Sequence, residues 1–159
     1  MAMFQPAPKP PTALGYHRIL SAKAGARVSP LCLGAMNFGK AWAGMMGECD
    51  KDQSFKIMDY FYDSGGNFID TANVYQNEES EEWMGEWMEK RGVRDQIFVA
   101  TKYTSNYRIG HQGEEQMSAF VGNSAKSMHV SVRASLKKLK TDYIDLLYVH
   151  WYVDPETTA

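Results

Sequence analysis

Short apolar runs alternate along most of this chain with longer segments whose apolar residues recur at helical spacing. The short runs predict strands over 31–36, from 68 onward, over 97–100 and over 143–149. The segments between them predict three helices, which begin near 50, 79 and 124. Because strands separated by helices of 10–15 residues indicate βαβ units, the pattern predicts an α/β fold with a parallel sheet.

Local signals mark the expected ends of these helices. The segment 50–53 (DKDQ) resembles a capping box, and Gly65-Gly66 closes the same helix. Gly92 ends the second helix, and Asn123 or Ser124 caps the third. We expect the third helix to bury the face formed, at steps of four, four and three, by Met128, Val132, Leu136 and Leu139.

The element count predicts half of a larger fold. Segments 16–20 and 27–29 flank a short turn and predict a β-hairpin, after which four strands and three helices follow. A (β/α)8 TIM-type barrel contains eight of each, so the pattern predicts an N-terminal half-barrel over 15–159. Residues 1–14 contain four prolines and are expected to form a flexible arm, and 153–159 resembles the approach to a fourth helix.

Composition narrows the class of protein. With 159 residues, 44% of them hydrophobic, the chain is long enough for one core. A net charge of −2 and a pI near 6.1 argue against nucleic acid or an anionic membrane as the main partner. Two cysteines fit a reducing compartment, and no apolar run approaches the roughly 20 residues that span a bilayer. We therefore expect a cytoplasmic protein.

Four polar residues follow these apolar runs: Asp70 and Tyr75 after the second, Lys102 after the third and His150 after the fourth. The carboxyl ends of barrel strands meet at one mouth, where barrel enzymes carry out their chemistry. An ammonium beside a phenol favours its ionised form, which makes Tyr75 the better proton donor. Asp70 would hold Lys102 in place, and His150 would hydrogen-bond the reacting oxygen.

This set of groups suits protonation of a carbonyl oxygen while a hydride arrives from a cofactor, so a nicotinamide is implied. The chain contains no glycine-rich dinucleotide motif and no P-loop. Taken singly, such residues more often have a structural role than a catalytic one. Asp70 would then be a helix cap, Lys102 a surface residue, Tyr75 a loop aromatic and His150 a core histidine. Their joint placement favours catalysis. Asp70, His111 and His150 lack paired-ligand spacing, so we expect no metal.

One connection, 103–123, has no clear periodicity and contains several aromatic residues and glycines. Loops longer than about 12–15 residues are uncommon and are often functional. Because it follows the strand that carries Lys102, we expect it to lie over the mouth of the half-barrel.

Four segments resemble one known family, the aldo-keto reductases, and among them the fungal aryl-alcohol dehydrogenase and norsolorinic acid reductase-like group. They are LCLGAMNFG at 31–39, GNFIDTANVY at 66–75, VATK at 99–102 and DYIDLLYVHW at 142–151. The resemblance implies a catalytic tetrad of Asp70, Tyr75, Lys102 and His150, with Tyr75 as general acid. It implies NADP(H) as cofactor, with Gly34, Ala35, Met36 and Asp70 beside the nicotinamide ribose. It implies aldehydes, ketones or aryl alcohols as substrates.

Family members close the barrel with four further strands, which carry most of the cofactor contacts. An alternative is therefore a truncated, non-catalytic half-barrel that acts as an interaction module. Its outer strands would leave open backbone edges, which proteins seldom leave uncovered. Pairing of two copies as a homodimer would cover them.

Overall fold

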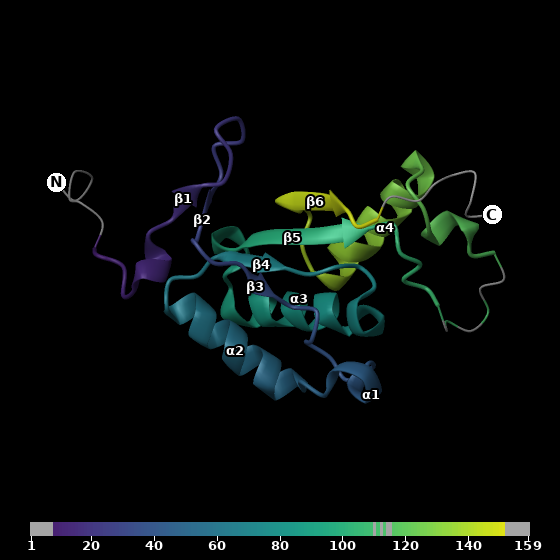
Figure 1. Ribbon diagram of the computed structural model, residues 1–159, viewed down its shortest axis with the longest axis horizontal. Coiled ribbons are helices and arrows are strands. Elements are labelled where there is room, and N and C mark those ends of the chain that lie inside the picture. Colours follow the sequence, from purple (N-terminus) through teal and green to yellow (C-terminus); the bar gives the residue numbers. More distant parts are fainter. Residues whose placement is uncertain (1–7, 110, 112, 114–115, 152–159) are drawn as a thin grey trace.

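The computed structural model describes residues 8–109, 111, 113 and 116–151. Its main sheet has four parallel strands in the spatial order β3 (Leu33–Gly34), β4 (Phe68–Asp70), β5 (Phe98–Tyr103) and β6 (Leu146–Val149) (Figure 1). Neighbours in space are therefore consecutive in the sequence. This is the winding of a barrel, and it confirms the predicted half-barrel of the α/β class.

Three helices connect these strands: α2 (Lys51–Asp63), α3 (Glu79–Arg91) and α4 (Ala125–Lys138). Residues of α2 and α3, together with Leu139 directly after α4, form one hydrophobic core with the sheet, so the three helices cover the same face. Its most deeply buried members include Met58, Ile69, Trp87, Val99 and Leu139. Figure 1 shows α2 and α3 below the strands. In the described part of the chain the opposite face of the sheet carries no helix, which leaves room for a cavity.

Shorter elements complete the fold. The predicted hairpin is present as β1 (Arg18–Ile19) and β2 (Arg27–Val28), which pair antiparallel. A short helix, α1 (Ala43–Met46), was not predicted. It lies in a loop that Gly39 and Cys49 close by exchanging two backbone hydrogen bonds. Short 3-10 helices occupy Ala13–Gly15, Tyr75–Glu78, Arg94–Gln96 and Ser118–Phe120.

The helix caps follow the sequence signals closely. Asp50 accepts a hydrogen bond from the Gln53 amide at 2.8 Å, and Gly92 ends α3 in the left-handed conformation with φ 64°. Of the two candidates for the third cap, the structure selects Ser124, whose hydroxyl accepts from the Ser127 amide. Because each cap satisfies an amide that a helix start leaves unpaired, these local signals place helix starts well.

The predicted buried face of α4 is wrong in part. Ser127, Ser131 and Ser135 are buried in line with Leu139, whereas Met128 is 38% exposed. The reason is the close approach of α3, because a Cβ added to Gly85 would lie 2.2 Å from the Lys138 carbonyl oxygen. The buried face of α4 is lined by serines, whose small side chains fit this close packing. The size of the side chains therefore decided which face is buried, and their polarity did not.

The two ends of the chain lie partly outside the described residues. In the arm, Thr12 donates to the Ser64 carbonyl at 2.7 Å, and its first seven residues are not described. The expected approach to a fourth helix, 153–159, also lies outside the described residues. The boundary at 14/15 stays a prediction. No helix of the described ranges is both long and apolar enough to cross a membrane.

Candidate active site

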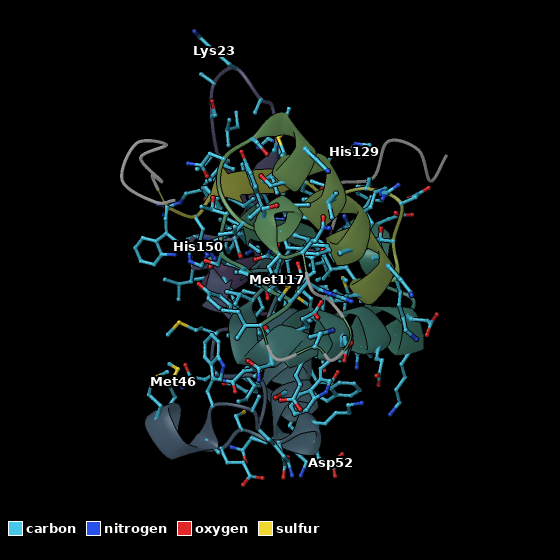
Figure 2. All side chains as sticks on the ribbon, turned by 90° about the vertical axis from the view of Figure 1, so that its right-hand side faces the viewer. Lys23, Met46, Asp52, Met117, His129 and His150 are labelled. Atoms are coloured by element: carbon cyan, nitrogen blue, oxygen red, sulfur yellow. The ribbon has the colours of Figure 1, made fainter. Side chains whose placement is uncertain are left out.

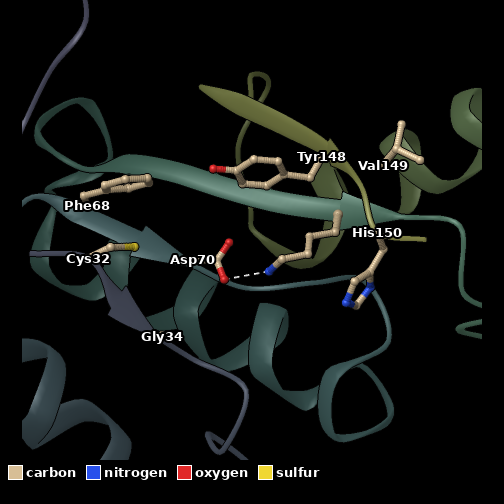
Figure 3. A pocket seen from close by; sticks show the side chains of 8 residues that line it. Cys32, Gly34, Phe68, Asp70, Tyr148, Val149 and His150 are labelled. Atoms are coloured by element: carbon tan, nitrogen blue, oxygen red, sulfur yellow. Dashed lines mark hydrogen bonds and ion pairs between the residues drawn. The ribbon is translucent and has the colours of Figure 1, made fainter. Parts of the chain in front are cut away.

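A cavity of about 550 Å³ opens on the helix-free face of the sheet (Figure 3). Three pairs of lining residues lie two apart, 32 with 34, 68 with 70 and 148 with 150, because side chains two apart on a strand share a face. Of the predicted site residues it contains Gly34, Asp70, Lys102 and His150. Sequence reasoning missed Cys32, Phe68, Tyr148 and Val149. A step of two from Gly34, Asp70 and His150 would have found all of these except Val149.

Lys102 and Asp70 form the ion pair drawn in Figure 3. The ammonium donates to Asp70 Oδ2 at 2.6 Å and to the Thr71 carbonyl oxygen at 2.7 Å. The two side chains are only 15% and 27% exposed, so water screens the pair weakly. The strand register brings them together, because Asp70 ends β4 and Lys102 lies two residues beyond its partner Ala100 on β5. The pair fixes a positive charge at the cavity.

Tyr75 lies beside this ammonium, at the start of the turn that precedes α3. The Lys102 Nζ is 4.9 Å from the centre of its ring. The ring is 9% exposed and meets His150 edge-on, with centroids 5.7 Å apart. Its other edge-on neighbour is Trp42, at 6.3 Å. The structure therefore brings Asp70, Tyr75, Lys102 and His150 together, as the strand-end argument expects.

His150 follows β6 directly and lies on the opposite side of the molecule from His129 (Figure 2). Its amide donates to the Tyr103 carbonyl at 2.9 Å, and its ring stacks on Trp151 with centroids 5.1 Å apart. Burial and then the Lys102 ammonium lower the pKa of the imidazole, and Asp70 opposes them. His150 is therefore neutral at neutral pH, and within the described residues its buried Nδ1 has no hydrogen-bond partner.

The lowered pKa of His150 makes stability depend on pH. Below the ordinary value of 6.5, the unfolded chain takes up this proton before the folded one does, so the free energy of unfolding decreases as pH falls. We expect His150→Gln to lose less stability than the wild type between neutral and acidic pH. Urea unfolding at both pH values measures this, with His129→Gln on α4 as control. Equal losses in the wild type and His150→Gln would contradict the assignment.

The turn that presents Tyr75 has a rare backbone. Gln76, Asn77 and Glu78 all have positive φ, at 53°, 51° and 82°, although none is glycine. Each such residue is unfavourable by roughly 1–2 kcal/mol. The Gln76 side chain holds the turn, because it accepts from the Trp42 amide at 2.8 Å and donates to the Met36 carbonyl at 3.0 Å. No local sequence pattern predicts this turn.

The residues expected beside the cofactor differ in how they face the cavity. Gly34 lines it, and a Cβ added there would meet nothing within 4 Å. The Ala35 side chain is buried in the core, its amide donates to the Asp70 carbonyl and its carbonyl accepts from Ser80. Met36 is 39% exposed. Of the three, Gly34 alone lines the cavity, and cofactor contact remains a prediction.

Cys32 lines the same cavity, and the pKa of its thiol is raised. Burial, followed by the charge of Asp70, raises its pKa to about 11, against the opposing effect of the Lys102 ammonium. The thiolate is the reactive form of cysteine, and at neutral pH the Cys32 thiol is protonated. It therefore adds apolar surface to the cavity and no nucleophile.

The loop 103–123 contacts the helix side of the sheet. Tyr107 lies against the Lys138 ammonium, 4.8 Å from the ring centre, and His111 pairs with Glu78 at 2.9 Å. None of the described loop residues lines the cavity, and the expected position of the loop over the mouth stays a prediction. Over the ranges that the structure describes, no three His, Cys, Asp or Glu side chains form a metal cluster.

Known proteins resemble the chain in sequence and in fold. Residues 30–158 match the Aldo/keto reductase family. Norsolorinic acid reductase A of Aspergillus parasiticus is 60% identical over 146 residues, 92% of this chain and 37% of the relative. Aryl-alcohol dehydrogenase [NADP(+)] of Phanerodontia chrysosporium is 57% identical over 155 residues, 96% of this chain and 40% of the relative. The chain thus spans about two fifths of their length.

A solved structure shows the same arrangement of strands and helices. The holo form of an aldo-keto reductase from Bacillus halodurans matches with a TM-score of 0.69 and 30% identity. The match covers 88% of this chain and 42% of the solved one. The sheet and its three helices therefore correspond to a little under half of a complete barrel.

Proposed function

The chain belongs to the aldo/keto reductase family, and from this premise we propose that it provides the proton-donating half of an NADP(H)-dependent oxidoreductase site. The substrates are aldehydes or ketones, or aryl alcohols in the reverse direction. One observation supports this proposal above the others: Asp70, Lys102 and His150 line one cavity, and the Tyr75 ring lies against Lys102 and His150 directly behind this lining. The name of the Phanerodontia chrysosporium relative supports the choice of NADP(H).

Each residue of this group has a separate task in the proposed reaction. Tyr75 donates its hydroxyl proton to the carbonyl oxygen as that oxygen gains negative charge. The Lys102 ammonium, fixed by Asp70 and the Thr71 carbonyl, stabilises the charge left on the tyrosine oxygen. The neutral His150 orients the substrate oxygen by a hydrogen bond. Because these groups are fixed before substrate arrives, no reorganisation is needed during the reaction.

The cavity fits the proposed cofactor in one respect that the structure shows. The absence of a side chain at Gly34 leaves open space above the strand end, so a flat group can approach the backbone. The cavity volume of about 550 Å³ lies in the usual range of small-molecule sites. When bound, NADP(H) supplies the hydride. Gly34, Ala35, Met36 and Asp70 are the residues that would contact it here.

We expect Gly34→Leu to weaken NADPH binding by about tenfold or more, because the new side chain fills the open space above β3. An NADPH fluorescence titration of the 159-residue chain measures the affinity. Gly44→Leu in α1 is the matched control, because a Cβ there also meets nothing within 4 Å and Gly44 does not line the cavity. An unchanged affinity in Gly34→Leu would place the cofactor elsewhere, and no saturable signal from the folded wild type would contradict cofactor binding by this chain.

A second proposal, self-association, rests on the exposed edges of the sheet. β3 and β6 are its outer strands. Large apolar side chains on or beside them are exposed: Leu31 at 67%, Tyr148 at 41%, Val149 at 56% and Trp151 at 62%. A second copy of the chain would cover these edges, as a closed symmetric dimer. Light scattering after size exclusion distinguishes a dimer from a monomer of 18.0 kDa, and a monomer would contradict this proposal.

We also propose a reducing, cytoplasmic location. Cys32 and Cys49 are both free thiols, so the described fold contains no disulfide between them. Free thiols persist in reducing compartments. Localisation of the tagged chain in cells would test this proposal.

A further inference from the structure

A buried group of charges lies on the helix side of the sheet, away from the cavity. Its centre is Lys138 at the end of α4, whose side chain is 8% exposed. The ammonium lies 2.8 Å from Glu78, 2.8 Å from Glu81 and 3.0 Å from the Asn73 carbonyl oxygen, to which it donates. Burial lowers the pKa of Lys138, but Glu81 and Glu78 outweigh it and the net pKa is raised. The lysine is therefore charged and held from three sides.

This group connects three parts of the fold to one another. Glu81 lies in the first turn of α3, is fully buried, and accepts a hydrogen bond from the Thr101 hydroxyl at 2.6 Å. Thr101 precedes Lys102 on β5. The same lysine thus joins the end of α4 to the start of α3 and to the strand that carries the catalytic ammonium. None of these residues lines the cavity.

Two of the three oxygen contacts of Lys138 bracket Tyr75 in the sequence. The Asn73 carbonyl lies two residues before it and Glu78 three residues after it. Between these contacts the chain passes through the left-handed residues Gln76 and Asn77, and Glu78 itself has φ 82°. Because this backbone is unfavourable without glycine, tertiary contacts must hold it. Lys138 and the Gln76 side chain hold the turn from different sides.

We propose that Lys138 is a positioning residue for Tyr75: its ammonium fixes the turn 73–78 so that the phenol lies against Lys102 and His150. The inference rests on the proposed function for its catalytic consequence, but the geometric part stands by itself. A lysine that contributes only to global stability would leave the native position of the ring unchanged once the variant is folded. Loss of a positioning lysine would change the position of the ring in the folded variant.

The test compares Lys138→Met with Lys138→Arg and with Lys137→Met, the neighbouring lysine without these contacts. Tyrosine rings carry ¹³C, and the Tyr75 signals are assigned by their loss in Tyr75→Phe. In Lys138→Met we expect the Tyr75 signals to shift or broaden while most other tyrosine signals stay in place. Lys138→Arg keeps a charged donor and restores them, and Lys137→Met leaves them unchanged. Unchanged Tyr75 signals in a folded Lys138→Met would overturn the proposal.

A second variant, Glu78→Gln, tests the proposal if Lys138→Met does not fold. It removes one charge beside the turn and leaves the Lys138–Glu81 pair, so the chain retains most of its buried contacts. The same selective change of the Tyr75 signals is expected, and its absence would also overturn the proposal. If the turn 73–78 stayed fixed in both variants, contacts other than Lys138, such as those of Gln76 and Trp42, would hold it.

A kinetic readout separates failure of this inference from failure of the proposed function. In a chain that reduces an aldehyde, we expect Lys138→Met to lower kcat by about tenfold or more, because small displacements of a catalytic group have large effects. KM for NADPH should change little, since no residue of the charged group lines the cavity. A Tyr75 signal change without any wild-type turnover supports positioning and contradicts the proposed function. Turnover that Lys138→Met leaves intact contradicts positioning.

Discussion

Replacing Tyr75 by phenylalanine is expected to abolish NADPH-dependent reduction of an aromatic aldehyde, with kcat falling by about 10²–10⁴-fold. The substitution removes the one proton donor of the proposed reaction and keeps the ring. That ring is 9% exposed and packs between Trp42, His150 and the Lys102 ammonium, so its contacts persist. The rate is measured as loss of NADPH absorbance at saturating aldehyde.

Tyr148→Phe is the matched control for this experiment. Tyr148 lines the cavity beside Lys102 and His150 and is 41% exposed, so the variant removes a phenol near the site without touching the proposed acid. We expect Tyr148→Phe to retain most of its turnover. The stability of Tyr75→Phe should change by about 1 kcal/mol or less, as for a single hydroxyl. A folded Tyr75→Phe that keeps the wild-type rate would assign proton donation to another group.

Replacing Gly85 by alanine is expected to destabilise the chain by about 2 kcal/mol, the largest stability change that we predict for a single added methyl group. Helix propensity alone argues the opposite, because alanine in a helix interior is about 1 kcal/mol better than glycine. Packing, however, decides whether the substitution stabilises or destabilises the chain. The added Cβ would lie 2.2 Å from the Lys138 carbonyl oxygen and 2.8 Å from the Leu139 Cα, and backbone atoms cannot rotate away.

Urea unfolding followed by circular dichroism measures this loss. Gly44→Ala in α1 is the control, because a Cβ there meets nothing within 4 Å and only propensity acts. We expect Gly44→Ala to be neutral or slightly stabilising. If Gly85→Ala were equally stable, α3 and α4 would have to separate at no cost. The same substitution displaces the end of α4, so we also expect it to disturb Lys138 and the turn that presents Tyr75.

The position of the site is predictable from the sequence because strand ends are local features. Asp70, Lys102 and His150 each come at or just after an apolar run, and parallel strands bring those ends to one edge. The count of four strands and three helices follows from the same alternation. The lining residues Cys32 and Tyr148 could have been found by the two-residue period of a strand.

Other features depend on contacts between segments far apart in the chain. The apolar spacing of α4 suggested Met128 as a buried residue, but Gly85 on α3 admits a close approach and the serine stripe lies inward instead. The turn after Tyr75 has no glycine to announce its left-handed backbone. Lys138 looks like an ordinary basic residue at the end of a helix, and its partner Glu78 lies 60 positions earlier.

The sequence by itself determined the order of the four parallel strands and of the three helices that connect them, most of their ends, and the four polar residues that lie close together at the strand ends. These follow from periodicity, capping and strand ends, which act over a few residues. Only the tertiary structure decided which face of α4 is buried and how the turn 73–78 is held. Those depend on close approach of helices and on buried charges that pair across the fold, because such energies arise only once distant segments meet.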